Sequence, residues 1–269
     1  MAANFSASLA SVDGAVMLAS RAVIPATDEG LLRGDGAFEV IRLYEGRPFA
    51  FEDHLRRLER SASNLRLPLD VEAIRADARR LLAHAGAGPA HELLRIVVTR
   101  GGRRLLLTEP LARHPDVIRL GSVTYSPTRV LDGVKSLSYA ANMLATRLAR
   151  ELGFDEALLV TPHGHVLEAP TSSIFWAAGG SLFTPPLDEH ILASITRAVV
   201  IEATGAEERA CTLEELLRAD EAFLASTTRE VEPVSAVDER RFDAPGTITQ
   251  RTAAEVGELI RERLAVTAS

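Results

Sequence analysis

Lysine is almost absent from this sequence. Of its 30 Lys and Arg residues only one is a lysine, Lys135, although lysine is normally among the commonest amino acids. Arginine serves wherever a fixed positive charge is needed, but its guanidinium does not lose its proton in a protein. A lysine amine can lose its proton, and it can form a Schiff base with a carbonyl compound. Lys135 is therefore a candidate catalytic residue, and the alternative is a lone lysine retained by chance on a solvated surface.

Three short motifs contain the partners that such a lysine needs. Imine chemistry on a pyridine ring requires a carboxylate at the ring nitrogen, and a bound phosphate requires Arg, hydroxyls or N–H groups, best at a helix start. Glu168 ends an expected strand before a small polar loop and suits the first role, although an ordinary strand-end carboxylate is the alternative. Hydroxyls occur at 194–196, where an expected helix begins, and at 226–228, where an expected strand ends. Helix capping and a common turn are the alternatives for these two segments.

An arginine for the phosphate is best sought on the expected helix 52–66. At 100° per residue its apolar stripe is centred near Leu58 and Leu65. Arg57 falls roughly 110° from that centre, whereas Arg56 and Arg60 fall roughly 150–170° away. Arg57 is thus the arginine that the geometry favours for turning inward.

Strands and helices are mixed in both halves of the chain, which predicts an α/β (α+β) fold. Asp70 and Gly86 are placed to begin and end one helix, and Gly153 to end another whose residues 140, 144, 148 and 152 form an apolar line. The expected strands are 37–44, 93–99, 117–124, 156–160, 165–168, 173–177, 181–184 and 221–226, and the expected helices are 52–66, 70–85, 139–152, 190–204, 212–219 and 247–264. The expected organisation is a first domain at 1–121, a connection at 122–133 and a second domain at 134–269.

Composition narrows the class of protein. With 46% apolar and 25% charged residues the chain is expected to fold, and its apolar runs stop short of the ~20 residues that span a bilayer. The single cysteine, Cys211, excludes an internal disulfide and a cysteine-based zinc site. The first residues resemble no secretory signal, so we expect a cytoplasmic protein. A net charge of −7 argues against nucleic acid as the main partner, and against an interaction module built on the arginine clusters.

Two further polar clusters are better explained by turns. His163-Gly164-His165 has a glycine at its centre between two expected strands, so a hairpin turn is expected there and no metal site. The arginine-rich segment 100–104 is expected to be a solvated loop tip, although such a loop could hold a substrate carboxylate.

Taken together, the motifs resemble a known family. Segments 34–42, 45–49 and 54–58 resemble the N-terminal half of class IV aminotransferases, the fold-type IV pyridoxal-phosphate enzymes. The second half agrees, and the match runs from about residue 5 to 264; the motifs that carry it are 135–139, 153–157, 166–168, 195–197 and 226–228. The family includes branched-chain aminotransferase, D-amino acid aminotransferase, R-selective amine transaminase and aminodeoxychorismate lyase. Small residues differ from the usual pattern at Ala169, Ser173 and Ser194.

The resemblance implies a role for each motif. Lys135 would form the internal aldimine with pyridoxal 5'-phosphate and then move the proton. Glu168 would pair with the pyridine nitrogen, and Tyr139 would bond the phenolic oxygen. The phosphate would be held by Arg57, Ile195, Thr196 and Thr227. The implied fold is a small α/β domain and a larger pseudo-barrel domain, and these enzymes are usually homodimers.

The resemblance also implies a reaction. An aminotransferase moves the amino group of an amino acid to a 2-oxo acid in two ping-pong half-reactions. Phe38, Arg42 and Thr228 would face the substrate, and the first two share a strand face with Val40. The run FEVIR is closer to the branched-chain pattern, whereas Val40 is similar to D-amino acid enzymes, so substrate handedness stays open. The alternative is an aminodeoxychorismate lyase, which releases pyruvate and 4-aminobenzoate with the same lysine and cofactor.

Overall fold

The computed structural model describes residues 7–266, which form two compact units. The first unit holds the chain up to Arg113 together with Val134–Tyr139. The second holds His114–Gly133 and the chain from Ala140 onward. None of the helices between residues 7 and 266 is long and apolar enough to span a bilayer.

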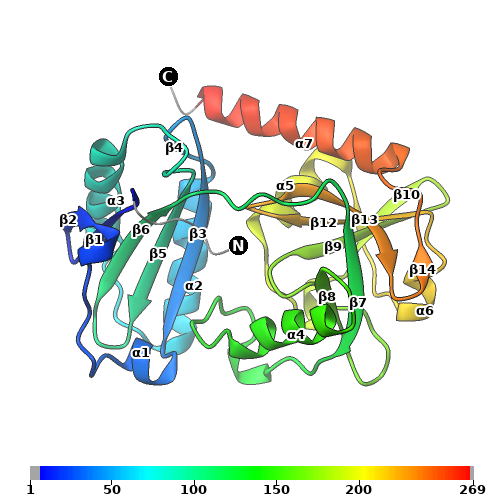
Figure 1. The fold of residues 1–269 in the computed structure, drawn as a ribbon, viewed down its shortest axis with the longest axis horizontal. Helices are drawn as coiled ribbons and strands as arrows, with labels where there is room; N and C mark the ends of the chain where they lie inside the picture. The colour runs from blue at the N-terminus through cyan, green and yellow to red at the C-terminus, as the bar shows by residue number, and fades with distance from the viewer. Residues whose placement is uncertain (1–6, 267–269) are drawn as a thin grey trace. The chain divides into compact units, whose positions relative to one another are not determined.

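The first unit is a six-stranded antiparallel sheet with helices on one face (Figure 1). The strand order is β2-β1-β6-β5-β3-β4, and α2 and α3 pack against β3, β1 and β6. Ile41, Leu58, Leu81 and Leu94 meet in the core between the sheet and these helices. The elements are β1 Leu9–Val12, β2 Ala15–Leu18, α1 Glu29–Arg33, β3 Gly36–Tyr44, β4 Arg47–Pro48, α2 Phe51–Leu65, α3 Val71–Ala85, β5 Leu93–Thr99 and β6 Arg104–Glu109.

The long elements of this unit follow the expected pattern. The side chain of Asp70 caps α3 by accepting a hydrogen bond from the N–H of Ala73 at 2.9 Å, and Gly86, with φ +64°, ends the helix. Along β3, Ala37 and Ile41 enter the core, so Glu39 shares their face, whereas Phe38, Val40 and Arg42 lie on the opposite face of the sheet. The predictions of a strand at 37–44 and of helices at 52–66 and 70–85 are confirmed to within a residue or two.

The second unit is built on one eight-stranded mixed sheet (Figure 1). The order along it is β11-β10-β9-β12-β13-β7-β8, with β14 paired to β13. Helices α5 and α7 pack on each other and on β12 and β13, while α4 packs on β7 and β8. The elements are β7 Ile118–Thr124, α4 Ala140–Glu151, β8 Glu156–Val160, β9 Ser173–Ala178, β10 Ser181–Thr184, α5 Ile195–Thr204, β11 Glu207–Glu208, α6 Leu213–Leu216, β12 Glu221–Ser226, β13 Glu230–Val237, β14 Arg240–Arg241 and α7 Thr247–Val266.

The boundaries of the compact units differ from the expected division at 121 and 134. Strand β7 pairs in parallel with β8 and β13, so the whole of it belongs to the second unit. Residues Val134–Tyr139 belong to the first unit because they hydrogen-bond to the start of β3.

Several expected elements are shorter than predicted. The strand expected at 165–168 consists only of isolated bridges, from Val166 to Val160 and from His165 to Thr212. The helix expected from 190 begins at Ile195, because Ser194 caps it there, and the helix expected at 212–219 covers only Leu213–Leu216. The sequence patterns do not predict helix α1 or the strands β1, β2, β4, β6, β11, β13 and β14.

The apolar line of α4 faces away from its own sheet. Leu144, Leu148 and Leu152 are 49%, 41% and 72% exposed. The face buried against β8 carries Ala145 and Ala149 instead, whose small side chains allow a close approach to the strand. A solvent-exposed line of leucines is a candidate contact surface.

Candidate active site

The backbone around Lys135 is fixed by β3 and α2 of its unit. The N–H of Phe38 donates to the carbonyl of Lys135 at 3.0 Å, and the N–H of Leu137 donates to the carbonyl of Gly36 at 2.9 Å. The N–H of Lys135 donates to Oγ of Ser61 on α2 at 3.1 Å. Lys135 therefore starts from a rigid position, as a catalytic side chain requires.

Two aromatic rings flank the amine of Lys135. Nζ lies 4.5 Å from the centroid of the Phe38 ring and 5.7 Å from that of Tyr139. The two rings meet edge to face, with centroids 5.4 Å apart. The structure thus brings three of the predicted site residues together, and the rings limit the directions that the amine can take.

Arg57 points inward, as the helical geometry predicts, and meets a buried carboxylate. Its Nε and Nη2 donate to the two carboxylate oxygens of Glu39, each at 2.7 Å. His54 Nδ1 lies 2.7 Å from Oε2 of the same carboxylate. The Arg57 side chain is 4% exposed and that of Glu39 is fully buried, whereas Arg56 lies at the surface. Such a bidentate pair fixes the plane of the guanidinium.

The pKa values of this group follow from its burial and charges. Burial alone would raise the pKa of Glu39, but the charge and hydrogen bonds of Arg57, with those of His54, lower the pKa to about 2. Burial lowers the pKa of His54, and its hydrogen bond to Glu39 only partly opposes this. Glu39 is thus a carboxylate and His54 a neutral ring at neutral pH. Sequence reasoning missed Glu39, although its place on the core face of β3 is a signal, since a charge there must be paired.

The other face of the same sheet carries two arginines. Phe38 and Arg42 lie on it with Val40, as the alternation predicts, and Arg95 of β5 stands opposite Val40. Nη2 of Arg95 donates to Oε2 of Glu109 at 3.0 Å, and its guanidinium carbon lies 5.7 Å from the Phe38 ring centroid. Arg95 was not predicted; the signal was a charge within the apolar alternation of 93–99.

The second unit carries the remaining predicted residues. Oε1 of Glu168 accepts a hydrogen bond from the N–H of Leu192 at 3.2 Å. Ile195 and Thr196 form the first turn of α5, where Oγ of Ser194 accepts from the N–H of Arg197 at 3.2 Å. The start of this helix offers N–H groups and a positive dipole end, which suit an anion.

The predicted hydroxyl run forms a tight turn between β12 and β13. The N–H of Arg229 donates to the carbonyl of Ser226 at 3.2 Å, and the hydroxyls of Ser226 and Thr228 are 3.4 Å apart. Thr227 is the next residue of the turn after Ser226. The segment therefore holds three hydroxyls on a short, well-fixed stretch of backbone.

The arginine-rich segment 100–104 is tied to the first unit by ion pairs. Arg100 binds Asp35 and the carbonyls of Leu65 and Arg66, at 2.7 and 2.8 Å. In the same segment, Arg103 pairs with Asp13 and Arg104 with Asp77. The segment joins β5 to β6 and exposes Gly101 and Gly102, so the prediction of a solvated loop tip is confirmed, and the loop is held in place by these ion pairs.

The segment 163–165 is a tight turn, as predicted. Gly164 has φ +85°, and the N–H of Thr161 donates to the carbonyl of His165 at 2.8 Å. Within residues 7–266, no group of three or more His, Cys, Asp or Glu side chains is arranged to hold a metal ion.

Comparison with known proteins finds relatives over most of the chain. The family model for amino-transferase class IV matches residues 36–237. A Methanocaldococcus jannaschii protein named as a branched-chain-amino-acid aminotransferase is 34% identical, with 88% of each chain covered. The D-alanine aminotransferase of Bacillus licheniformis is 30% identical over 88% of this chain and 92% of its own. The aminodeoxychorismate lyase of Bacillus subtilis is 30% identical over 86% and 87%.

Solved structures are similar over almost the whole chain. A fold IV-transaminase of Curtobacterium pusillum gives a TM-score of 0.83 at 29% identity and covers 96% of this chain and 99% of its own. A hypothetical aminotransferase of Mycobacterium tuberculosis in its PLP-bound form gives 0.81 at 26% identity, covering 94% and 98%.

Substitution of Gly36 by alanine is expected to disturb the Lys135 segment. A Cβ at Gly36 would lie 2.3 Å from the Val98 carbonyl oxygen and 2.6 Å from a methyl carbon of Leu137. We expect Gly36→Ala to lower the free energy of unfolding by about 1–3 kcal/mol. Urea denaturation measures this, with Gly88→Ala as the control because nothing lies within 4 Å of a Cβ there. Equal stability of the two variants would contradict the tight packing of this segment.

Stability is expected to fall on acidification through the Glu39 group. A carboxylate whose pKa is lowered from 4.5 to about 2 stabilises the fold above pH 4.5, and this contribution is lost as the pH falls toward 2. It amounts to about 3 kcal/mol. The lowered pKa of His54 acts in the same direction below pH 6.5, because the unfolded chain takes up the proton first.

Urea unfolding at a series of pH values tests this dependence. Glu39→Gln should be less stable than the wild type at neutral pH and should flatten the profile between pH 4.5 and 2. Parallel profiles for the two proteins would show that Glu39 is not held as a buried carboxylate.

Proposed function

Because the chain belongs to the class IV aminotransferase family, we propose that it moves the amino group of a branched-chain-like or D-amino acid-like donor to a 2-oxo acid. Enzymes of this family use pyridoxal 5'-phosphate as their cofactor. The observation that carries the proposal is the place of Lys135. The sole lysine of the sequence holds its amine against two aromatic rings on a rigid backbone.

The residue types at the predicted positions fit this cofactor in kind. An amine, a buried guanidinium, a helix N-terminus with hydroxyls and a carboxylate are the groups that its aldehyde, phosphate and ring nitrogen require. When bound, the cofactor supplies an electron sink that lets the α-carbon of the substrate lose a proton.

Each predicted residue then has a chemical task. Lys135 would bind the cofactor covalently and, once released by the substrate amine, would carry a proton to and from the α-carbon. Glu168, whose carboxylate already accepts an N–H, would hold the proton on the pyridine nitrogen. Tyr139 would donate to the phenolic oxygen.

Four residues are proposed as phosphate ligands: Arg57, Ile195, Thr196 and Thr227. Arg57 would bind it as a cation whose plane is set by Glu39. Ile195 and Thr196 would offer their N–H groups at the start of α5, and Thr227 its hydroxyl.

The substrate would lie against the mixed face of the first sheet. Phe38 and Val40 offer apolar surface, and Arg42 and Arg95 offer donors for a carboxylate. Thr228 would add a hydroxyl. This pattern suits a 2-oxo or amino acid with an apolar side chain.

A panel of L- and D-amino acids, each with 2-oxoglutarate or pyruvate as acceptor, tests the proposal. We expect product to form and an amino donor to bleach the visible absorbance of the lysine-bound cofactor. Pyruvate release from aminodeoxychorismate, without transamination of any donor, would instead identify a lyase of the kind found among the relatives.

Replacement of Lys135 by arginine should abolish turnover in a folded protein. Arginine keeps the charge but can neither bind the cofactor covalently nor release a proton near neutral pH. We expect Lys135→Arg to lose the visible band, with a loss of activity of at least about 100-fold, the contribution typical of a positioned proton carrier alone.

A matched control restores the lysine count at another place. The double variant Lys135→Arg with Arg60→Lys moves the single lysine to the exposed face of α2. It should remain inactive, because the position of the amine and not its presence matters. Wild-type transamination by either variant would overturn the mechanism.

We further propose that the enzyme is a homodimer. Leu144 and Leu148 on α4, with Leu152 just beyond it, form an exposed apolar line, and such lines mark contact surfaces. The wild type should have the mass of a dimer in light scattering, and Leu144→Glu with Leu148→Glu should shift the mass toward the monomer. A monomeric wild type would contradict this proposal.

A cytoplasmic location completes the proposal. Burial raises the pKa of the Cys211 thiol to about 12, so this residue stays a protonated packing group. Cell fractionation would test the location.

A further inference from the structure

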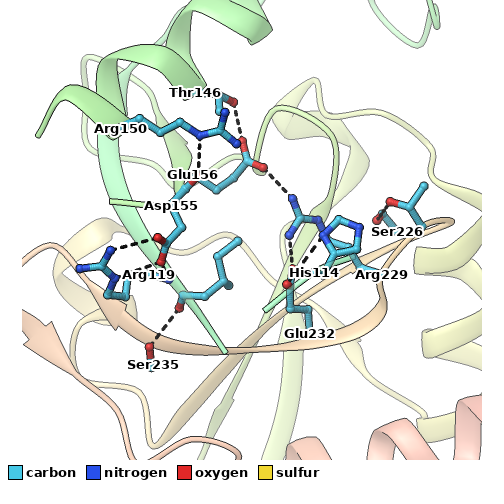
Figure 2. Close-up of polar contacts among 12 residues, drawn as sticks. His114, Arg119, Thr146, Arg150, Asp155, Glu156, Ser226, Arg229, Glu232 and Ser235 are labelled. Atoms are coloured by element: carbon cyan, nitrogen blue, oxygen red, sulfur yellow. Dashed lines mark hydrogen bonds and ion pairs between the residues drawn. The ribbon is translucent and has the colours of Figure 1, made fainter. Parts of the chain in front are cut away.

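Behind the hydroxyl turn lies a buried group of charges that the reaction does not use. Nη2 of Arg229 donates to Oε2 of Glu156 at 2.7 Å, and Nη1 pairs with Oε2 of Glu232 (Figure 2). The three side chains are 8%, 6% and 4% exposed. The other oxygen of Glu156 accepts a hydrogen bond from the hydroxyl of Thr146.

The guanidinium joins parts of the second unit that are not neighbours in its sheet. Arg229 is the last residue of the turn between β12 and β13, whereas Glu156 is the first residue of β8. Strand β7 lies between β13 and β8 in the strand order. Through Thr146 the connection reaches α4 as well. One side chain thus ties the turn to two further elements.

Burial makes this connection rigid. A buried charge without a partner is costly. If Arg229 moved away, the carboxylates of Glu156 and Glu232 would be left buried without a positively charged partner. Burial raises the pKa of Glu232, and the charge of Arg229 opposes this. The negative charges of Glu156 and Asp155 add to the rise in the pKa of Glu232, and His114 Nδ1 lies 3.9 Å from Oε1 of Glu232.

The backbone directly after the turn has a conformation that its residue does not favour. Glu230, the first residue of β13, has φ +55°, a conformation in which glycine or asparagine is usual. Nε of Arg229 is buried and makes no hydrogen bond within the described chain. These two costs are tolerated where the surroundings hold the backbone in place.

We infer that Arg229 is a positioning residue, which holds the hydroxyls of Thr227 and Thr228 in place by binding Glu156 and Glu232. The inference rests on the proposed function, in which Thr227 meets the cofactor phosphate and Thr228 the substrate. The 3.4 Å contact between the hydroxyls of Ser226 and Thr228 lies within the same turn.

Phosphate affinity tests the inference without any assay of activity. The dissociation constants of the apoenzyme for inorganic phosphate and for pyridoxal 5'-phosphate are measured by titration. We expect Arg229→Met to weaken both by about 10- to 100-fold, the factor that a hydrogen bond to a charged group supplies. Thr227→Val should weaken both by a similar factor.

A double variant separates positioning from general destabilisation. If Arg229 acts through Thr227, then Arg229→Met with Thr227→Val should bind about as weakly as Thr227→Val alone. Additive losses would overturn the inference.

The matched control is Arg119→Met. Arg119 makes two hydrogen bonds of 3.0 Å to the carboxylate of Asp155, directly before Glu156, and does not touch the turn (Figure 2). Its removal should leave both dissociation constants unchanged. If Arg229→Met does not fold, the variant that combines Arg229→Met, Glu156→Gln and Glu232→Gln removes all three charges together and replaces it.

The outcomes distinguish a failure of the proposed cofactor site from a failure of the positioning role of Arg229. Full phosphate affinity in Thr227→Val would refute the proposed cofactor site. Weakened binding in Thr227→Val, with full affinity in Arg229→Met or in the neutral triple variant, would refute the positioning role alone.

Discussion

The buried ion pair between Arg57 and Glu39 is the constraint on which the first unit depends. Arginine stays charged even when it is buried, so the chain must supply a carboxylate wherever a guanidinium enters the core. Glu39 is fully buried beneath α2 and accepts two hydrogen bonds from Arg57. Nδ1 of His54 lies within hydrogen-bond distance of the same carboxylate. The pair links the middle of β3 to α2, and these are the same two elements to which the backbone of Lys135 is bonded.

In the second unit, too, buried arginines are paired with carboxylates. Arg229 lies between Glu156 and Glu232, and Arg197, buried at the start of α5, pairs with Glu208 and donates to the carbonyl of Pro185 at 2.7 Å. In each case the guanidinium gives fixed geometry at a segment that the proposed function needs. The strong preference for arginine over lysine is thus consistent with structural charges that never titrate. The exception, Lys135, stands where a titrating amine is needed.

Local patterns predict the long elements of this fold and fail for those whose partners are distant. The strand at 37–44 is predictable because apolar and polar residues alternate between two turn signals, and α3 because Asp70 and Gly86 mark its ends. Strand β13 is not predictable, since Pro233 and its acidic residues argue against a central strand. It forms because β12 and β7 supply partners on both sides.

In the candidate site, too, features set by local sequence are predictable and features set by distant partners are not. Helical geometry selects Arg57 over Arg56, because the direction of a side chain on a helix is a local property. The partners of buried charges are not local: Glu39 lies 18 residues from Arg57 and Glu156 lies 73 from Arg229. Sequence reasoning assigns Lys135 and Thr227 but misses Glu39, Arg95 and the acidic partners of Arg229.

The choice between transamination and elimination depends on surfaces outside the cofactor motifs. Both reactions need the same amine, carboxylate and phosphate ligands, so those residues are equally suited to either. The residues that can differ are those that meet the substrate. On the first sheet the residues proposed to meet the substrate are Phe38, Val40, Arg42 and Arg95, which lie on one face of β3 and β5. Phe38 and Val40 offer apolar surface and the two arginines offer donors, which suits a carboxylic acid that carries an apolar side chain. Under the proposed assignment, the alternate residues of β3 and β5 select between the two reactions, because the residues around Lys135 suit both.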